Sequence, residues 1–188
     1  MIMKGLIKTL FTLIVLCCSV TAYCQQTFST PQFKREFLED INRIRQRGCN
    51  CGVTYMPPAA PLTWNYQLEY AALGHAQDMS DQNYFSHTSK DGRSMEDRIA
   101  LAGYRFKGYR SFMIGENIAM GQMSIAEVMH GWLKSEGHCK NLMNPAFKEV
   151  GVAEYNQYWV QDFGGREPFS AEEQKLIRSG RYRLIEKE

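Results

Sequence analysis

The stretch VGVAEYNQYWVQDF, residues 150–163, decides the fold class of this chain. Polar and apolar residues alternate on both sides of Tyr155-Asn156-Gln157, and a period of two residues is typical of β-strands with one buried face. Two alternating runs joined by a short polar segment predict a β-hairpin. Gly164-Gly165 follows directly and is expected to close the domain.

Helical periodicity dominates the chain upstream of this hairpin. Apolar residues recur every three or four positions over 32–47, which predicts an amphipathic helix that Gly48 ends. A second helix is expected to begin after the N-cap Asn65 and to run to about residue 83. The same spacing predicts further helices over 95–102 and 124–134.

The segments between these helices are expected to be one strand and two loops. Residues 114–120 are short and rich in β-forming side chains, which indicates a strand. Residues 104–113 show no period and predict a surface loop that partly covers a pocket, whereas three prolines within 57–61 hold the segment after the first helix in an extended loop. Together these elements predict an α+β fold, a three-layer α-β-α sandwich with a small, mostly antiparallel central sheet.

The first 24 residues have the pattern of a secretory signal peptide. Lys4 and Lys8 precede a short apolar run that is followed by small and polar residues, and cleavage after Ala22 or after Cys24 satisfies the small-residue rule. The run is shorter than the ~20 apolar residues of a membrane helix. We therefore expect a secreted, extracytoplasmic protein with no transmembrane segment.

The charge of the exported chain argues against nucleic acid as a partner. The formal net charge is +2, and removal of residues 1–24 would take away two lysines and no acid, which leaves zero. A protein that binds nucleic acid is expected to carry a clear excess of positive charge.

Three cysteines remain after removal of the expected signal peptide, namely Cys49, Cys51 and Cys139. In an oxidising compartment they predict one disulfide and one cysteine left over. We expect the bridge between Cys51 and Cys139, with Cys49 as the alternative partner of Cys139. A zinc site made by all three is a further alternative, although one residue between two ligands is a tighter spacing than usual.

Two histidines and a carboxylate, His87, Glu116 and His138, each lie beside a glycine or a small polar residue and predict one polar pocket. Neutral imidazoles can hold a divalent metal, and a carboxylate can complete the shell or orient a histidine from behind. His75 lies on the apolar stripe of the second helix, and we expect it to be a core histidine and not a ligand.

The chain resembles the CAP superfamily, which comprises cysteine-rich secretory, antigen 5 and pathogenesis-related 1 proteins, in its bacterial secreted form. The resemblance covers about residues 33–165. The motifs that carry it in order include PLTWN at 61–65, HAQDM at 75–79, YFSHT at 84–88, GENIA at 115–119, GH at 137–138 and YWVQDF at 158–163.

The resemblance implies an α-β-α sandwich whose central cavity is lined by two histidines and two acidic residues and binds divalent cations in some members. His87, Glu116 and His138 match three of these four positions. The fourth position holds Ser135, with Glu136 next to it. With one assured carboxylate, the resemblance implies a metal site that is weakened, open or lost.

These observations predict a secreted binding module whose cavity holds Zn²⁺ or another divalent cation through His87 and His138. Its partner would be an unknown small ligand, a lipid or an extracellular protein. The alternatives are a metal-assisted, peptidase-like hydrolase with Glu116 as general base, and a lipid or sterol carrier. The expected domains are the signal peptide 1–24, a linker 25–32, the CAP domain 33–165 and a charged tail 166–188 with a short helix after Ser170.

Overall fold

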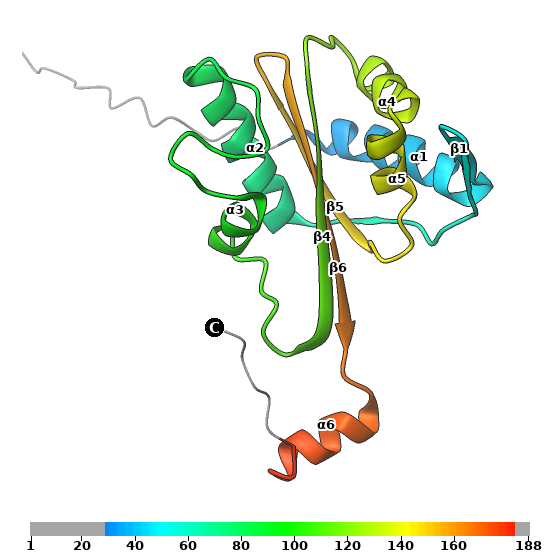
Figure 1. Cartoon of the computed structure of the whole chain (residues 1–188), viewed down its shortest axis with the longest axis vertical. Coiled ribbons are helices and arrows are strands. Elements are labelled where there is room, and N and C mark those ends of the chain that lie inside the picture. Colours follow the sequence, from blue (N-terminus) through cyan, green and yellow to red (C-terminus); the bar gives the residue numbers. More distant parts are fainter. Residues whose placement is uncertain (1–28, 183–188) are drawn as a thin grey trace, which may run out of the picture.

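The computed structural model describes residues 29–182 (Figure 1). The expected signal peptide, its cleavage site and its cysteines Cys17, Cys18 and Cys24 lie outside this part of the chain. Between residues 29 and 182, no helix has the length and apolar character needed to cross a membrane.

A four-stranded sheet forms the middle of the fold, with the strand order β3-β5-β6-β4. The short strand β3 (Thr63–Trp64) pairs in parallel with β5 (Glu149–Tyr155), and the other neighbours in the sheet, β5 with β6 (Tyr158–Pro168) and β6 with β4 (Tyr109–Met120), are antiparallel. The sheet is therefore mostly antiparallel, as predicted.

The predicted hairpin is formed by β5 and β6. Tyr155 pairs with Tyr158, so that only Asn156 and Gln157 connect the strands, and both have positive φ angles of 50° and 65°. Two such residues in succession form the tight turn whose twist matches that of an antiparallel pair. The hairpin therefore fixes the register of the two central strands.

Helices cover both faces of the sheet. Helices α2 (Tyr66–Asp81) and α3 (Met95–Leu101) lie on one side of the strands, and α1 (Pro31–Arg47), α4 (Ile125–Lys134) and α5 (Glu136–Met143) lie on the other (Figure 1). This arrangement confirms the predicted α-β-α sandwich.

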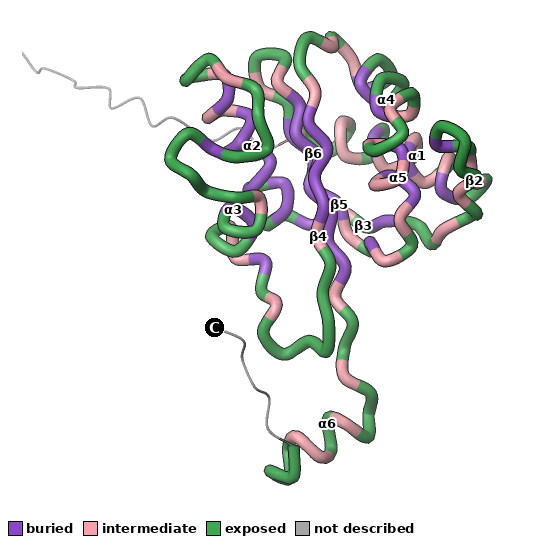
Figure 2. The backbone as a smooth tube through the Cα atoms, viewed as in Figure 1, coloured by how far each residue is buried: buried purple, intermediate pink, exposed green. Residues whose placement is uncertain are grey.

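Strand β6 is buried on both faces because one apolar cluster lies on each side of the sheet (Figure 2). Its Trp159 and Phe163 pack with side chains of α1 and α4, whereas Val160 packs with alanines and Met79 of α2. Alternate residues of one strand thus face different helical layers, as the pleat of a strand requires.

Helix α2 lies directly on β5. A Cβ atom at Gly151 would lie 2.0 Å from the backbone nitrogen of Glu69, so that only glycine allows this approach. Asn65 caps the helix as predicted, since its side chain accepts hydrogen bonds from the amides of Gln67 and Leu68. The position of α2 is therefore fixed at its first turn.

The expectation of a loop over 104–113 is wrong for residues 109–113, which belong to β4 and pair with β6 as far as Pro168. The pairing is supported by stacking, because the guanidinium carbon of Arg166 lies 4.1 Å from the ring centroid of Tyr104 and 4.9 Å from that of Tyr109. Stacking of this kind gives no periodic pattern in sequence.

Among the short elements, the small hairpin after α1 and helix α5 were not predicted, whereas the short helix after Ser170 was. The segment after α1, expected to be a loop, forms a small hairpin of β1 (Cys49–Cys51) and β2 (Thr54–Met56). Helix α5 was not predicted. The expected short helix after Ser170 is α6 (Ala171–Arg178). It begins with a capping box formed by Ser170 and Glu173.

Candidate functional site

The candidate site lies beside β4, the edge strand of the sheet. Two helices approach this edge and bind its backbone: Asn141 of α5 donates to the carbonyl oxygen of Glu116 at 3.2 Å, and Trp132 of α4 donates to that of Ile118 at 3.2 Å. Side chains from two helices of the same layer therefore reach this part of β4.

A buried ion pair forms the centre of the site. The Arg98 guanidinium donates to Glu116 Oε2 at 2.7 Å, and Glu116 Oε1 lies 2.7 Å from His87 Nδ1. The Glu116 side chain is only 2% exposed, whereas that of His87 is 57% exposed. The three residues thus connect a buried cation to an imidazole at the surface.

The loop that carries His87 is fixed by two buried side chains. His75 Nε2 lies 2.9 Å from the carbonyl oxygen of Ser86, and Arg98 Nη1 donates to the carbonyl oxygen of His87 at 3.0 Å. Because a carbonyl only accepts, His75 carries its proton on Nε2. Burial lowers the pKa of His75, which keeps the ring neutral. His75 is fully buried, and its imidazole holds the backbone of this loop in place.

Glu116 is ionised. Burial favours its neutral form, but the hydrogen bond from His87 and the charge of Arg98 together outweigh burial and hold its pKa below the ordinary value. Both carboxylate oxygens have partners. Glu116 therefore acts as an anchor for two neighbouring side chains.

A second carboxyl group, Asp162, lies opposite Glu116 in the pairing of β4 with β6. Asp162 is fully buried, and neither of its oxygens accepts a hydrogen bond from the residues that the structure describes. Burial, and then the negative charge of Glu116, raise the pKa of Asp162 well above its ordinary range. The fold therefore favours the protonated form of Asp162 beside the charged Glu116.

His138 reaches the site from α5. Its carbonyl oxygen accepts a hydrogen bond from Asn117 of β4 at 3.3 Å, and the residue is half-buried. Burial and the charge of His87 lower the pKa of its imidazole. His138 is therefore within the electrostatic influence of His87, although it comes from the opposite helical layer.

Ser135 and Glu136, at the fourth position where the family has an acidic residue, do not bring a second carboxylate to Glu116. Ser135 joins α4 to α5, and Glu136 forms an ion pair with Lys140. The Glu136 carboxylate also lies against Gly52, where a Cβ atom would be 2.7 Å from Oε2. Glu136 is therefore placed beside the β1–β2 hairpin.

The geometry limits how a metal ion could be held. Within residues 29–182, the only group of three or more potential ligands whose donor atoms all lie within 4.8 Å of one another is Cys49, Cys51 and Cys139. Cys51 and Cys139 form a disulfide, which removes two thiolates from that set. At the histidine site each Glu116 oxygen already has a partner, His87 or Arg98, so a metal ion there would depend mainly on the two imidazoles.

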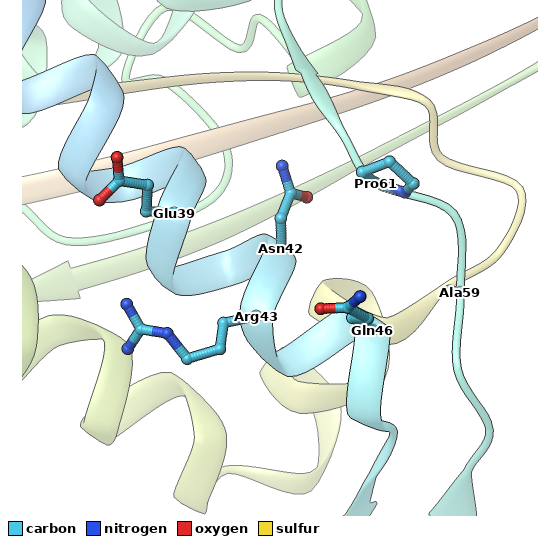
Figure 3. A pocket seen from close by; sticks show the side chains of 6 residues that line it. All are labelled: Glu39, Asn42, Arg43, Gln46, Ala59 and Pro61. Carbon is cyan, nitrogen blue, oxygen red and sulfur yellow. The ribbon is translucent and has the colours of Figure 1, made fainter.

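One cavity lies away from this cluster. It has a volume of about 480 Å³ and is lined by polar side chains of α1, among them Glu39 and Gln46, together with Ala59 and Pro61 (Figure 3). A smaller cavity of about 290 Å³ between α2 and α3 is lined by residues that include His75 and Arg98. This second cavity reaches the buried end of the site.

Sequence reasoning missed two residues of the site. Arg98 was not singled out as a site residue, and Asp162 entered only through the predicted hairpin and the motif at 158–163. The alternation of the strand could have indicated Asp162, because residues two apart point to the same face and Val160 is buried. An acid on the inward face of a strand indicates a specific role.

The family model of the cysteine-rich secretory protein (CAP) family matches residues 38–163. The chain therefore belongs to this family. Two relatives come from Bacillus subtilis: the uncharacterized protein YkwD, 40% identical over 140 residues, and the uncharacterized membrane protein YlbC, 38% identical over 104 residues. The matches cover 73% and 55% of this chain but only 49% and 29% of those relatives.

Solved structures show the same fold. An extracellular protein containing an SCP domain from Bacillus anthracis is 32% identical with a TM-score of 0.59, and the match covers 72% of this chain and 43% of that one. An outer surface protein from Borrelia burgdorferi is 20% identical with a TM-score of 0.59, covering 74% of this chain and 96% of that one. The second likeness shows the fold alone.

Proposed function

We propose that this protein is a secreted binding module of the CAP family, in which His87 and His138 contact the ligand. The observation that carries the proposal is the buried pair of Arg98 and Glu116, which ends on the exposed imidazole of His87. Removing two charges from water costs several kcal/mol per ion unless their geometry is favourable. Because the buried pair holds the His87 ring in one orientation at the surface, we infer that this ring contacts a ligand.

The hydrogen bond that His87 donates to Glu116 determines which atom of His87 faces a ligand. Because Nδ1 points to the carboxylate, Nε2 is the atom left for an external group. A carboxylate behind a histidine fixes its ring and makes it a better donor to a metal. We therefore assign Glu116 the role of orienting His87 from behind, and not that of a metal ligand.

A divalent cation fits this arrangement as a ligand held by two imidazoles, those of His87 and His138. Neutral imidazole nitrogens are good donors for Zn²⁺, and the low pKa of His138 keeps its ring neutral. Such an ion would provide an open position for a further ligand. With two protein donors we expect weak binding.

The hydrolase alternative has less support. A general base needs a pKa near the working pH, whereas the pKa of Glu116 is held below its ordinary value. The lipid-carrier alternative would need an apolar groove, whereas the cavity beside α1 is lined mainly by polar side chains.

Calorimetric titration of Zn²⁺ into tag-free mature protein tests the proposal. The Cys49→Ser background removes the free thiol as a competing ligand. We expect His87→Ala and His138→Ala each to weaken binding at least tenfold, and Glu116→Gln to weaken it about 10–100-fold through loss of ring orientation. His130 is an exposed histidine of α4, and His130→Ala is the matched control. It should bind Zn²⁺ as tightly as the Cys49→Ser parent. Equal affinity in all variants would contradict the metal part.

The export part rests on the sequence and is tested separately. We propose that residues 1–24 are the signal peptide, 25–32 a linker, 33–165 the CAP domain and 166–188 a charged tail. N-terminal sequencing of the exported protein should begin at Tyr23 or at Gln25. Retention of residues 1–22 in the mature protein would contradict this assignment.

A further inference from the structure

The three cysteines of the described chain meet on one side of α5. Cys51 and Cys139 are joined by a disulfide, and the free Cys49 has its Sγ 3.8 Å from that of Cys139. All three sulfur atoms lie within 4.8 Å of one another. A free thiol is therefore in van der Waals contact with a disulfide sulfur.

The geometry of β1 explains this contact. Cys49 and Cys51 are two residues apart on the strand, and such residues project from the same face. Both therefore point toward Cys139 on α5. Burial distinguishes them: Cys51 and Cys139 are fully buried, whereas Cys49 is partly exposed.

We propose that Cys49, Cys51 and Cys139 form a thiol–disulfide exchange site, in which Cys139 pairs alternately with Cys51 and Cys49. The Cys49 thiolate attacks Cys139 Sγ, the Cys49–Cys139 bond forms as the Cys51–Cys139 bond breaks, and Cys51 leaves as the thiolate. The proton lost by Cys49 is replaced by one that Cys51 takes from solvent. One disulfide and one thiol are present before and after, so the step needs no oxidant or reductant.

The exchange changes which sulfur solvent can reach. In the described pairing both bridged sulfurs belong to fully buried residues. In the exchanged pairing one bridged sulfur belongs to Cys49, which a thiol of another molecule can approach. The site would thus alternate between a protected and an accessible disulfide while the β1–β2 hairpin stays attached to α5.

Peptide mapping after acid quenching tests the exchange. Protein purified without reductant is incubated at neutral pH, quenched in acid, and alkylated with N-ethylmaleimide under denaturing, weakly acidic conditions. Cys49 and Cys51 share one tryptic peptide, residues 48–90, and fragmentation at Asn50 shows which of them carries the label. We expect label on both residues in different molecules.

Two variants separate exchange from other causes. In Cys49→Ser the label on Cys51 should disappear, because no thiol remains to release it. In Cys51→Ser the mapping should find Cys49 bridged to Cys139 in folded protein, as judged by circular dichroism. Label confined to Cys49 in the wild type, equal label on Cys51 in Cys49→Ser, or free thiols in folded Cys51→Ser would each overturn the proposal.

Discussion

Glu116 and Asp162 lie directly opposite one another on β4 and β6, and the fold lowers the pKa of Glu116 and raises that of Asp162. The difference comes from their partners. Arg98 and His87 stabilise the charge of Glu116, whereas Asp162 is fully buried beside that charge and receives no hydrogen bond from residues 29–182. A second negative charge beside Glu116 would be repelled, so burial and this repulsion both favour a proton on Asp162.

Substitution of Asp162 by asparagine should stabilise the protein increasingly as the pH rises. The raised pKa means that the folded protein keeps a proton that the unfolded chain loses above about pH 4. Wild-type stability contributed by this group therefore falls as the pH rises toward the folded-state pKa. Asp162→Asn removes the titration, and urea unfolding at about pH 4, 5.5 and 7 should show its advantage growing. An advantage that shrinks with pH would show that Asp162 is ionised in the fold.

Loss of the Glu116 charge should have a large cost. Glu116→Gln leaves Arg98 buried without an opposing carboxylate, and removal of one member of a buried pair typically costs about 3–5 kcal/mol. Because the folded-state pKa of Glu116 is lowered, its contribution is present above about pH 4 and is lost in acid. The cost measured by urea unfolding should therefore be largest near neutral pH.

The exposed ion pair of Glu136 and Lys140 provides the control for this experiment. Both side chains are more than 40% exposed, at 49% and 43%. Glu136→Gln should cost at most about 1 kcal/mol, because solvent screens such pairs. Similar costs at positions 116 and 136 would contradict the structural role assigned to the buried pair.

Two glycine substitutions should have opposite effects on stability. Gly151→Ala places a Cβ 2.0 Å from the Glu69 nitrogen, so that α2 must move from the sheet, and we expect a loss of about 3 kcal/mol or more. Gly131→Ala in α4 meets no atom within 4 Å and should stabilise by about 0.5–1 kcal/mol through helix propensity. Thermal unfolding of both variants measures the difference, and equal effects would argue against close packing of α2 on β5.

The disulfide should contribute strongly to stability. Cys51 and Cys139 are 88 residues apart, and closure of a loop of this length stabilises by about 4 kcal/mol in the chain-entropy model. Cys139→Ser removes the shared partner and should show this loss in urea unfolding. Cys49→Ser keeps the described bridge and should differ from wild type by less than about 0.5 kcal/mol. A small effect of Cys139→Ser would mean that the bridge constrains the unfolded chain little.

The elements that sequence predicted well are those with local signals. Asn65 caps α2, and the alternating runs around Tyr155 form the hairpin, because capping and strand periodicity act over a few residues. Helix α5 has only 8 residues and no side-chain cap at Ser135. Its position depends on the distant bonds of Cys139 and Asn141, which leave no local pattern.

The site was less accessible to sequence analysis than the fold. His87 and Glu116 are 29 residues apart, and such a spacing carries no information about contact. The resemblance to a family suggested that they meet, and the structure joins them by a hydrogen bond. The role of Arg98 depends on its contact with Glu116 across 18 residues, which periodicity on a single helix does not reveal.

The side chains that bind the outer edge of β4 also affect whether the chain can associate with its own copies. An open strand edge is a template to which another chain can add a strand, and repeated addition leads to aggregation. Asn141 and Trp132 occupy carbonyl oxygens of Glu116 and Ile118, so that this stretch offers those groups to no other backbone. The two helices that support the site thereby also protect this edge of the sheet from self-association.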